Sequence, residues 1–164
     1  MGKIIAFSGS HGTGKTTAAH ALMAQLKVSE PGIDIGFLGE VARRCPYPIN
    51  LDGCVRGQLW IFCEQIKQEL ELMRQHDLVV ADRCLLDSIA YTYHHGFDMA
   101  EAMKDLYWSY LEKEEPYQEI RFLNPKPGYL QADGLREVDP SFQTEVHEIL
   151  KRLHLETGGP LVWP

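Results

Sequence analysis

A glycine-rich segment near the start of the chain constrains the fold more than any other feature. Gly9–Thr16 reads Gly-Ser-His-Gly-Thr-Gly-Lys-Thr, a full match to the pattern G-x-x-x-x-G-K-[ST]. A short apolar run, Lys3–Ser8, precedes it, and a stretch rich in Ala, Leu and Met, near Gly14–Lys27, follows. This order predicts a strand, a tight loop and a helix, an arrangement in which the loop binds phosphate groups.

The residue types of this loop indicate which ligand it binds. The glycines permit backbone torsions that turn successive N–H groups towards phosphate oxygens, and the helix adds its N-terminal dipole. Lys15 supplies a positive charge for the β- and γ-phosphates, and the Thr16 hydroxyl is a ligand for Mg²⁺. We therefore predict a site for ATP or GTP with Mg²⁺. The predicted nucleotide-binding residues are Gly9, Ser10, His11, Gly12, Thr13, Gly14, Lys15, Thr16 and Thr17.

Composition and charge narrow the alternatives. The chain has 164 residues and 45% hydrophobic content, which predicts one folded domain over residues 1–164. Its net charge of −7 disfavours a nucleic-acid partner, because binding the phosphate backbone needs clustered Lys and Arg. No apolar stretch is long enough to cross a membrane, and no targeting segment is visible. The four cysteines lack zinc or redox spacing, so we expect free thiols and a cytoplasmic protein.

The rest of the chain alternates short apolar runs with amphipathic stretches, which is typical of a parallel α/β sheet. The expected strands are Lys3–Ser8, Ile33–Gly39, Leu78–Asp82, Glu119–Leu123 and Leu161–Trp163. The expected helices lie near Gly14–Lys27, Val55–Gln75, Leu86–Tyr93, Met99–Lys113 and Ser141–Thr157. Residues 124–139 are irregular and rich in Pro and Gly, and a loop of this length in a small domain predicts a lid.

The second of these helices has the clearest periodicity. Its apolar residues recur every three or four positions, and Glu and Gln occupy the other face. The apolar residues are Leu59, Phe62, Cys63, Ile66, Leu70 and Met73. The pattern predicts an amphipathic helix that buries this apolar face.

Two classes of nucleotide-binding protein fit poorly. GTPases of the switch type need an Asn-Lys-x-Asp segment after a strand, and the segment Asn124–Pro127 lacks the Asp and contains two prolines. Motor and oligomeric ATPases usually need a longer chain. A compact phosphotransferase remains.

The segment Asp82–Tyr91 resembles the Asp-Arg motif of the thymidylate-kinase and deoxynucleoside-kinase group, including its downstream Ala-Tyr. Together with the loop, Glu40-x-x-Arg43 and Asp133-Gly134-Leu135-Arg136, it most closely resembles the ribosylnicotinamide-kinase-like ATPase domain of the bifunctional NAD-biosynthesis regulator. The resemblance implies a three-layer P-loop NTPase fold, with about five parallel strands, helices on both faces and a short lid. ATP and acceptor would meet above the carboxyl ends of the strands.

The resemblance also implies roles for individual residues. Asp82 would hold Mg²⁺ through water, and Arg83 would reach acceptor or phosphoryl oxygens. Glu40 would take the proton from the attacking hydroxyl, although Asp82 is an alternative base. Each of these side chains also has a purely structural interpretation, as a helix cap, a surface ion pair or a solvated acid.

Further residues are candidates for contact with the acceptor or the transferred group. Arg43 or Arg44 would face the acceptor, and Arg136 in the lid would contact the γ-phosphate. Gln65 stands where thymidylate kinases carry an arginine for the acceptor's monophosphate. A glutamine offers a donor and an acceptor to a base or amide edge, which favours a nucleoside-like acceptor, although core or surface duty is equally open.

The sequence thus predicts an ATP- and Mg²⁺-dependent kinase for a small nucleoside-like or nucleotide acceptor. A nucleoside monophosphate kinase and a regulatory AAA-type ATPase module with a protein partner are the alternatives. We expect no nucleic-acid or membrane partner, and the sequence leaves a homodimer open.

Overall fold

A parallel sheet lies at the centre of the computed structural model, which describes residues 1–126, 128, 139–157 and 159–163. The strands are β1 (Lys3–Ser8), β2 (Ile35–Leu38), β3 (Leu78–Asp82), β4 (Tyr117–Phe122) and β5 (Leu161–Val162), in the order β2-β3-β1-β4-β5. The helices are α1 (Lys15–Ser29), α2 (Val55–Gln75), α3 (Leu85–His94), α4 (Met99–Glu114) and α5 (Pro140–Thr157), with short 3₁₀ helices η1 (Val41–Arg44) and η2 (Asn50–Asp52).

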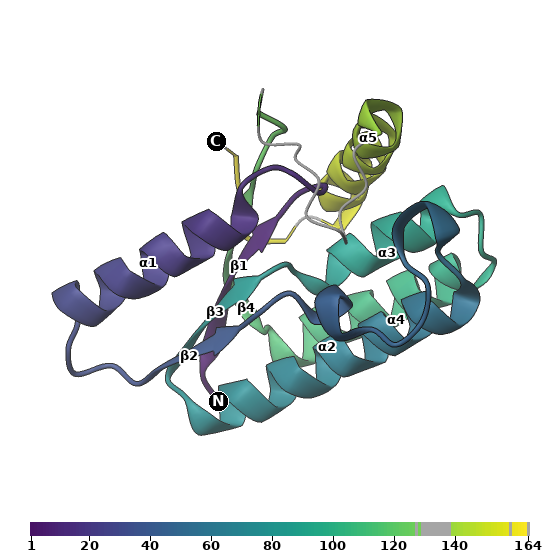
Figure 1. Cartoon of the computed structure of the whole chain (residues 1–164). Helices are drawn as coiled ribbons and strands as arrows, with labels where there is room; N and C mark the ends of the chain where they lie inside the picture. Colours follow the sequence, from purple (N-terminus) through teal and green to yellow (C-terminus); the bar gives the residue numbers. More distant parts are fainter. Residues whose placement is uncertain (127, 129–138, 158, 164) are drawn as a thin grey trace.

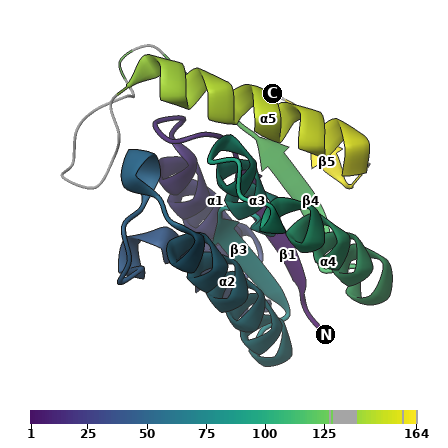
Figure 2. The same ribbon diagram turned by 90° about the vertical axis from the view of Figure 1, so that its right-hand side faces the viewer.

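Helices cover both faces of the sheet, with α1 on one side and α2, α3 and α4 on the other (Figures 1 and 2). The alternation of side chains along β1 explains these two layers. Ile5 and Phe7 pack with Ala19 of α1, whereas Ile4 and Ala6 belong to the cluster on the opposite face. The predicted three-layer α/β fold with five parallel strands is confirmed.

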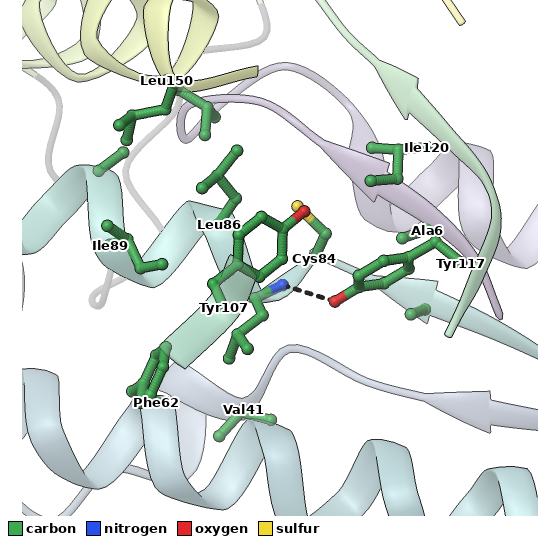
Figure 3. Close-up of a cluster of buried hydrophobic side chains, with 14 of the residues drawn as sticks. Ala6, Val41, Phe62, Cys84, Leu86, Ile89, Tyr107, Tyr117, Ile120 and Leu150 are labelled. Carbon is green, nitrogen blue, oxygen red and sulfur yellow. Dashed lines mark hydrogen bonds between the residues drawn. The ribbon is translucent and has the colours of Figure 1, made fainter. Parts of the chain in front are cut away.

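The larger core lies on the face opposite α1 (Figure 3). Its centre is α3, which packs against α2, α4 and α5 and is buried from Leu85 to Thr92. Tyr107 of α4 and Leu150 of α5 are fully buried in the same cluster. Because neighbours surround α3, its side chains show little of the polar stripe that marks a surface helix.

Element boundaries differ modestly from those predicted. β2 is shorter, because Ile33 and Gly39 lie outside the ladder that pairs Ile35–Leu38 with β3. β4 begins two residues earlier than predicted, since Tyr117 pairs with Ile4. The 3₁₀ helices were not predicted. Most of the predicted lid, residues 124–139, lies outside the described residues.

The buried face of α2 differs from the predicted one. Leu59, Cys63 and Leu70 are exposed, whereas three polar side chains are buried. These are Gln58, Gln65 and Glu69. The predicted buried apolar face is therefore wrong in part. Gln58 and Gln65 face the larger pocket described below, and the hydroxyls of Tyr110 and Tyr117 donate to Glu69.

The parallel arrangement places the functional segments together. All carboxyl ends of parallel strands lie at one edge of a sheet, where open α/β sheets bind ligands. The glycine-rich loop follows β1, Glu40 follows β2, and Arg83 follows β3. Within the described residues, no helix is both long and apolar enough to span a membrane.

Candidate active site

The glycine-rich loop joins β1 to α1 in a conformation that needs glycine. Gly9, Gly12 and Gly14 have φ values of 151°, 67° and 86°. A Cβ atom on Gly9 would lie 2.6 Å from the carbonyl oxygen of Leu123, the residue after β4, so this close approach also excludes a side chain. Such torsions let a loop direct backbone N–H groups towards a ligand at the helix N-terminus.

The side chain of Lys15 folds back onto this loop. Its Nζ donates hydrogen bonds to the Ser10 carbonyl at 2.5 Å and to Thr13 Oγ1 at 3.2 Å. Burial, followed by the positive charge of Arg83, lowers the Lys15 pKa to about 7, against partial compensation by nearby acids. The amine thus stands in a pocket where a bound anion would stabilise its charged form.

Thr16 and Asp82 form the part of the site that fits Mg²⁺. Thr16 Oγ1 donates to Asp82 Oδ2 at 2.6 Å. The second carboxylate oxygen, Oδ1, is buried without a hydrogen-bond partner in the described part of the chain. Mg²⁺ prefers hard oxygen ligands and usually takes one or two carboxylates together with substrate phosphates. No group of three or more His, Cys, Asp or Glu that could hold a metal occurs among the described residues.

Glu40 and Arg83 form a partly buried ion pair. Arg83 Nε and Nη2 lie 2.9 and 2.7 Å from Glu40 Oε1, and Arg43 Nε donates to Glu40 Oε2 at 2.9 Å. Burial alone would raise the Glu40 pKa, but the charges of Arg83 and Lys15 outweigh it and lower the pKa to about 2. Glu40 is therefore an ionised hydrogen-bond acceptor at neutral pH.

Arg83 adopts an unusual backbone conformation. It has φ 113°, a region that side-chain-bearing residues rarely adopt and that costs about 1–3 kcal/mol. Its guanidinium also contacts Asp87 Oδ1 at 3.3 Å and lies 5.6 Å above the Tyr91 ring. Such strain persists only where surrounding contacts hold it, which is typical of functional sites.

Asp87 is a site residue to which the sequence analysis gave no role. Its carboxylate accepts the Gly9 N–H at 3.2 Å and the Cys84 N–H at 3.1 Å, in addition to Arg83. It therefore links the phosphate loop, the arginine and the N-terminus of α3. Its position three residues after Cys84, as the acid of a capping box, was the signal available in the sequence.

Two pockets adjoin at these residues. A small polar pocket, with about 230 Å³ of empty space, is lined by the loop, Thr16 and Asp82. A larger one, with about 670 Å³ open in part to solvent, lies beside it. His11, Glu40 and Arg83 line both, so they form the shared wall.

The larger pocket has apolar walls and a few polar groups. Ile49, Ile61 and Tyr91 supply part of its apolar lining. Gln58 lines it, is only 2% exposed, and forms no side-chain hydrogen bond with any described residue. Because this amide lines the pocket without a side-chain partner among the described residues, it is available to a ligand.

The predicted acceptor-binding residues have distinct surroundings. Gln65 lines the larger pocket, but its Nε2 already donates to Glu69 Oε1 at 3.0 Å and to the Arg83 carbonyl at 3.3 Å. Of the two adjacent arginines, Arg43 lines the pocket. Arg136 lies outside the described residues, so its predicted role stays a prediction.

Comparisons with known proteins agree with this architecture. A family described as "AAA domain" matches residues 4–162. The solved structure of thymidylate kinase from Ehrlichia chaffeensis is similar, with a TM-score of 0.69 and 17% sequence identity, over 99% of this chain and 86% of that one. No curated protein gives a significant sequence match. The structural similarity confirms the P-loop NTPase fold of nucleotide kinases.

Proposed function

The chain belongs to the AAA domain family, and on this premise we propose that it is a kinase that transfers the γ-phosphoryl group of ATP to a hydroxyl of a small nucleoside-like acceptor. The family and fold support nucleotide phosphotransfer or ATP hydrolysis in general. The observation that carries the narrower proposal is the pair of adjoining pockets with Glu40 and Arg83 in their shared wall.

The small pocket suits the triphosphate. The loop N–H groups and Lys15 would bind its phosphates, and Thr16 and Asp82 would hold Mg²⁺. The metal, when bound, offsets the charge that develops on the phosphate oxygens. ATP hydrolysis alone would not require a second pocket beside the first. Phosphoryl transfer requires a pocket that binds the acceptor.

Glu40 is the better placed candidate to orient the acceptor hydroxyl. It lines both pockets, whereas Asp82 lines only the small one and accepts the Thr16 hydroxyl. Its lowered pKa makes it a weak base, so it would hold the hydroxyl by a hydrogen bond and receive the proton only late in the transfer. Arg83 would contact the transferred group, and ADP and the phosphorylated acceptor would be the products.

The charge balance of the larger pocket supports an acceptor that carries no phosphate group. Its two arginines, Arg43 and Arg83, pair with its own acids, Glu40 and Asp87. The phosphate of a nucleoside monophosphate could pair with one of these arginines only if an existing ion pair were broken. The available Gln58 amide instead matches the donor and acceptor groups of a base or carboxamide edge.

The test measures ADP release from ATP with nucleosides, nucleoside monophosphates or ribosylnicotinamide added one at a time. One acceptor without a phosphate group should stimulate release, with the phosphorylated product identified by mass spectrometry, and EDTA should abolish the reaction. The K15A variant should lose all turnover, which checks that the nucleotide site is responsible.

The same assay distinguishes the main alternatives. Preferential stimulation by a nucleoside monophosphate would indicate a nucleoside monophosphate kinase. Turnover that no acceptor changes, without phosphorylated product, would contradict the proposal and favour a regulatory ATPase module.

A further inference from the structure

Glu69 is a buried carboxylate that lines neither pocket. It lies on α2, is 0% exposed, and accepts three hydrogen bonds. Gln65 Nε2 and the Tyr117 hydroxyl donate to its Oε1 at 3.0 and 2.8 Å, and the Tyr110 hydroxyl donates to Oε2 at 3.1 Å. Burial raises its pKa to about 7, against these hydrogen bonds. Burying an acid costs free energy unless hydrogen bonds compensate for the lost contact with water.

Two of these three side chains also form hydrogen bonds with the backbone of one turn, at residues 83–85. Gln65 Nε2 also donates to the Arg83 carbonyl at 3.3 Å, and the Tyr117 hydroxyl accepts the Leu85 N–H at 3.0 Å. Figure 3 shows the Tyr117 hydroxyl pointing at this backbone nitrogen. The Tyr110 hydroxyl makes no further hydrogen bond within the described chain. The two branches from Oε1 therefore converge on residues 83–85, and the branch from Oε2 does not.

This turn needs outside support. It connects the end of β3 at Asp82 to the start of α3 at Leu85, and it contains the positive φ of Arg83. The N–H of Leu85 is one of the N-terminal donors that a helix leaves without an internal partner. A fixed carbonyl on one side and a satisfied N–H on the other restrict the rotation of the turn.

We propose that Glu69 is a positioning residue that, through Gln65 and Tyr117, holds the turn at residues 83–85 and so directs the Arg83 guanidinium at the wall between the two pockets. The effect on acceptor kinetics rests on the proposed function, because it requires Arg83 to act on the transferred group. The effect on the orientation of the Arg83 side chain does not rest on the proposed function.

The test compares two substitutions, each of which removes one tyrosine hydroxyl that donates a hydrogen bond to the Glu69 carboxylate. Y117F removes a branch that reaches the turn, and Y110F removes the branch that does not. The Arg83 Nε–H resonance, assigned with R83K in ¹⁵N-labelled protein, should shift in Y117F and remain within its linewidth in Y110F. Thermal unfolding of both variants measures the general loss of stability separately.

Kinetics supply a second readout. In Y117F, kcat/KM for the acceptor should fall about 10- to 100-fold with the KM for ATP nearly unchanged, because displacement of one group affects the transfer step. Y110F should stay near wild type. E69Q keeps an amide oxygen for Gln65 and Tyr117 and should preserve acceptor kinetics, whereas E69M should reproduce Y117F if it folds.

The outcomes separate this proposal from the function proposed above. Equal changes of the Arg83 resonance in Y117F and Y110F, or none in either, would overturn the positioning role. If wild type shows no acceptor-stimulated transfer, the kinase proposal fails, and the resonance comparison still decides whether the network positions Arg83.

Discussion

Arg83 and Glu40 meet through two contacts on one oxygen: Nε and Nη2 of the arginine lie 2.9 and 2.7 Å from Glu40 Oε1. Both side chains line the wall that the small pocket and the larger pocket share. The other Glu40 oxygen accepts Arg43. One carboxylate thus fixes two guanidinium groups at the point where donor and acceptor would meet.

The E40Q substitution tests this arrangement. The amide keeps the size of the side chain but loses the negative charge that orients both arginines and receives the acceptor's proton. We expect kcat for acceptor phosphorylation to fall about 10²- to 10⁴-fold, with nucleotide affinity changed far less. Single-turnover transfer and equilibrium binding of a non-hydrolysable ATP analogue measure the two effects.

Glu64 provides the matched control for this experiment. It lies on α2 in a surface pair with Lys67 at 3.6 Å, and it lines neither of the two pockets. E64Q should leave both measurements near wild type, since exposed ion pairs contribute little. A similar loss of transfer in E64Q, or an unchanged rate in E40Q, would contradict the role given to Glu40.

The lowered pKa of Lys15 predicts a pH-dependent affinity for ATP. In the empty protein this pKa is about 7, because the amine is buried beside Arg83. The bound triphosphate should raise it, so binding above pH 7 takes up a proton. The affinity should therefore fall as pH rises above 7, by up to about tenfold per pH unit. Calorimetry in buffers of different ionisation enthalpy measures the proton uptake.

K15R is the comparison for this prediction, because arginine stays protonated throughout the range. Its affinity should be lower than that of wild type near pH 7 and nearly independent of pH above it. The comparison also removes the contribution of ATP's own ionisation. Parallel pH profiles for wild type and K15R would show that Lys15 does not titrate on binding.

The Gln58 amide lines the larger pocket without a side-chain hydrogen bond to a described residue, which predicts a role in acceptor recognition. Q58L removes the amide at nearly constant volume and should raise the KM for the acceptor about two- to tenfold, the effect of one neutral hydrogen bond. The KM for ATP should not change. Q68L is the control, because Gln68 lies on the same helix but pairs with Glu64 outside the pocket. Equal effects of the two substitutions would exclude specific recognition by Gln58.

Local sequence patterns predicted which residues gather around the small pocket. The loop, Lys15 and Thr16 are contiguous, and Asp82 ends a strand that neighbours β1, so the fold brings them together in a way the pattern implies. The order β2-β3-β1 also places Glu40 and Arg83 at the same edge. Once the parallel α/β class is known, these positions follow from strand ends alone.

The acceptor half could not be predicted in the same way. Gln58 and Gln65 are seven residues apart and lie on one face of α2, so helical periodicity cannot tell which amide is available. The turn after β3 reaches Gln65 and occupies its nitrogen. Glu69 was placed on the polar face by pattern, whereas Tyr110 and Tyr117, distant in sequence, form a buried polar site for it.

The contact between α5 and β1 leads to the last prediction. His154 Nε2 lies 2.7 Å from the Ser8 hydroxyl, directly before the phosphate loop, and both side chains are buried. Burial lowers the His154 pKa from its usual 6.5 to about 4, with partial compensation from Asp87. Between these two pH values the unfolded chain binds a proton at this site that the folded chain does not. The free energy of unfolding should therefore decrease as the pH falls from 6.5 to 4, by up to about 3 kcal/mol from this group.

Urea unfolding of H154Q across this pH range measures that contribution. The variant cannot titrate at position 154, so its stability should fall less steeply between pH 6.5 and 4 than that of wild type, even if it is less stable at pH 7. H20Q is the control for the loss of one histidine, because His20 is exposed on α1. If H154Q and wild type lose stability in parallel, His154 is protonated in the folded protein and does not anchor α5 as a neutral imidazole.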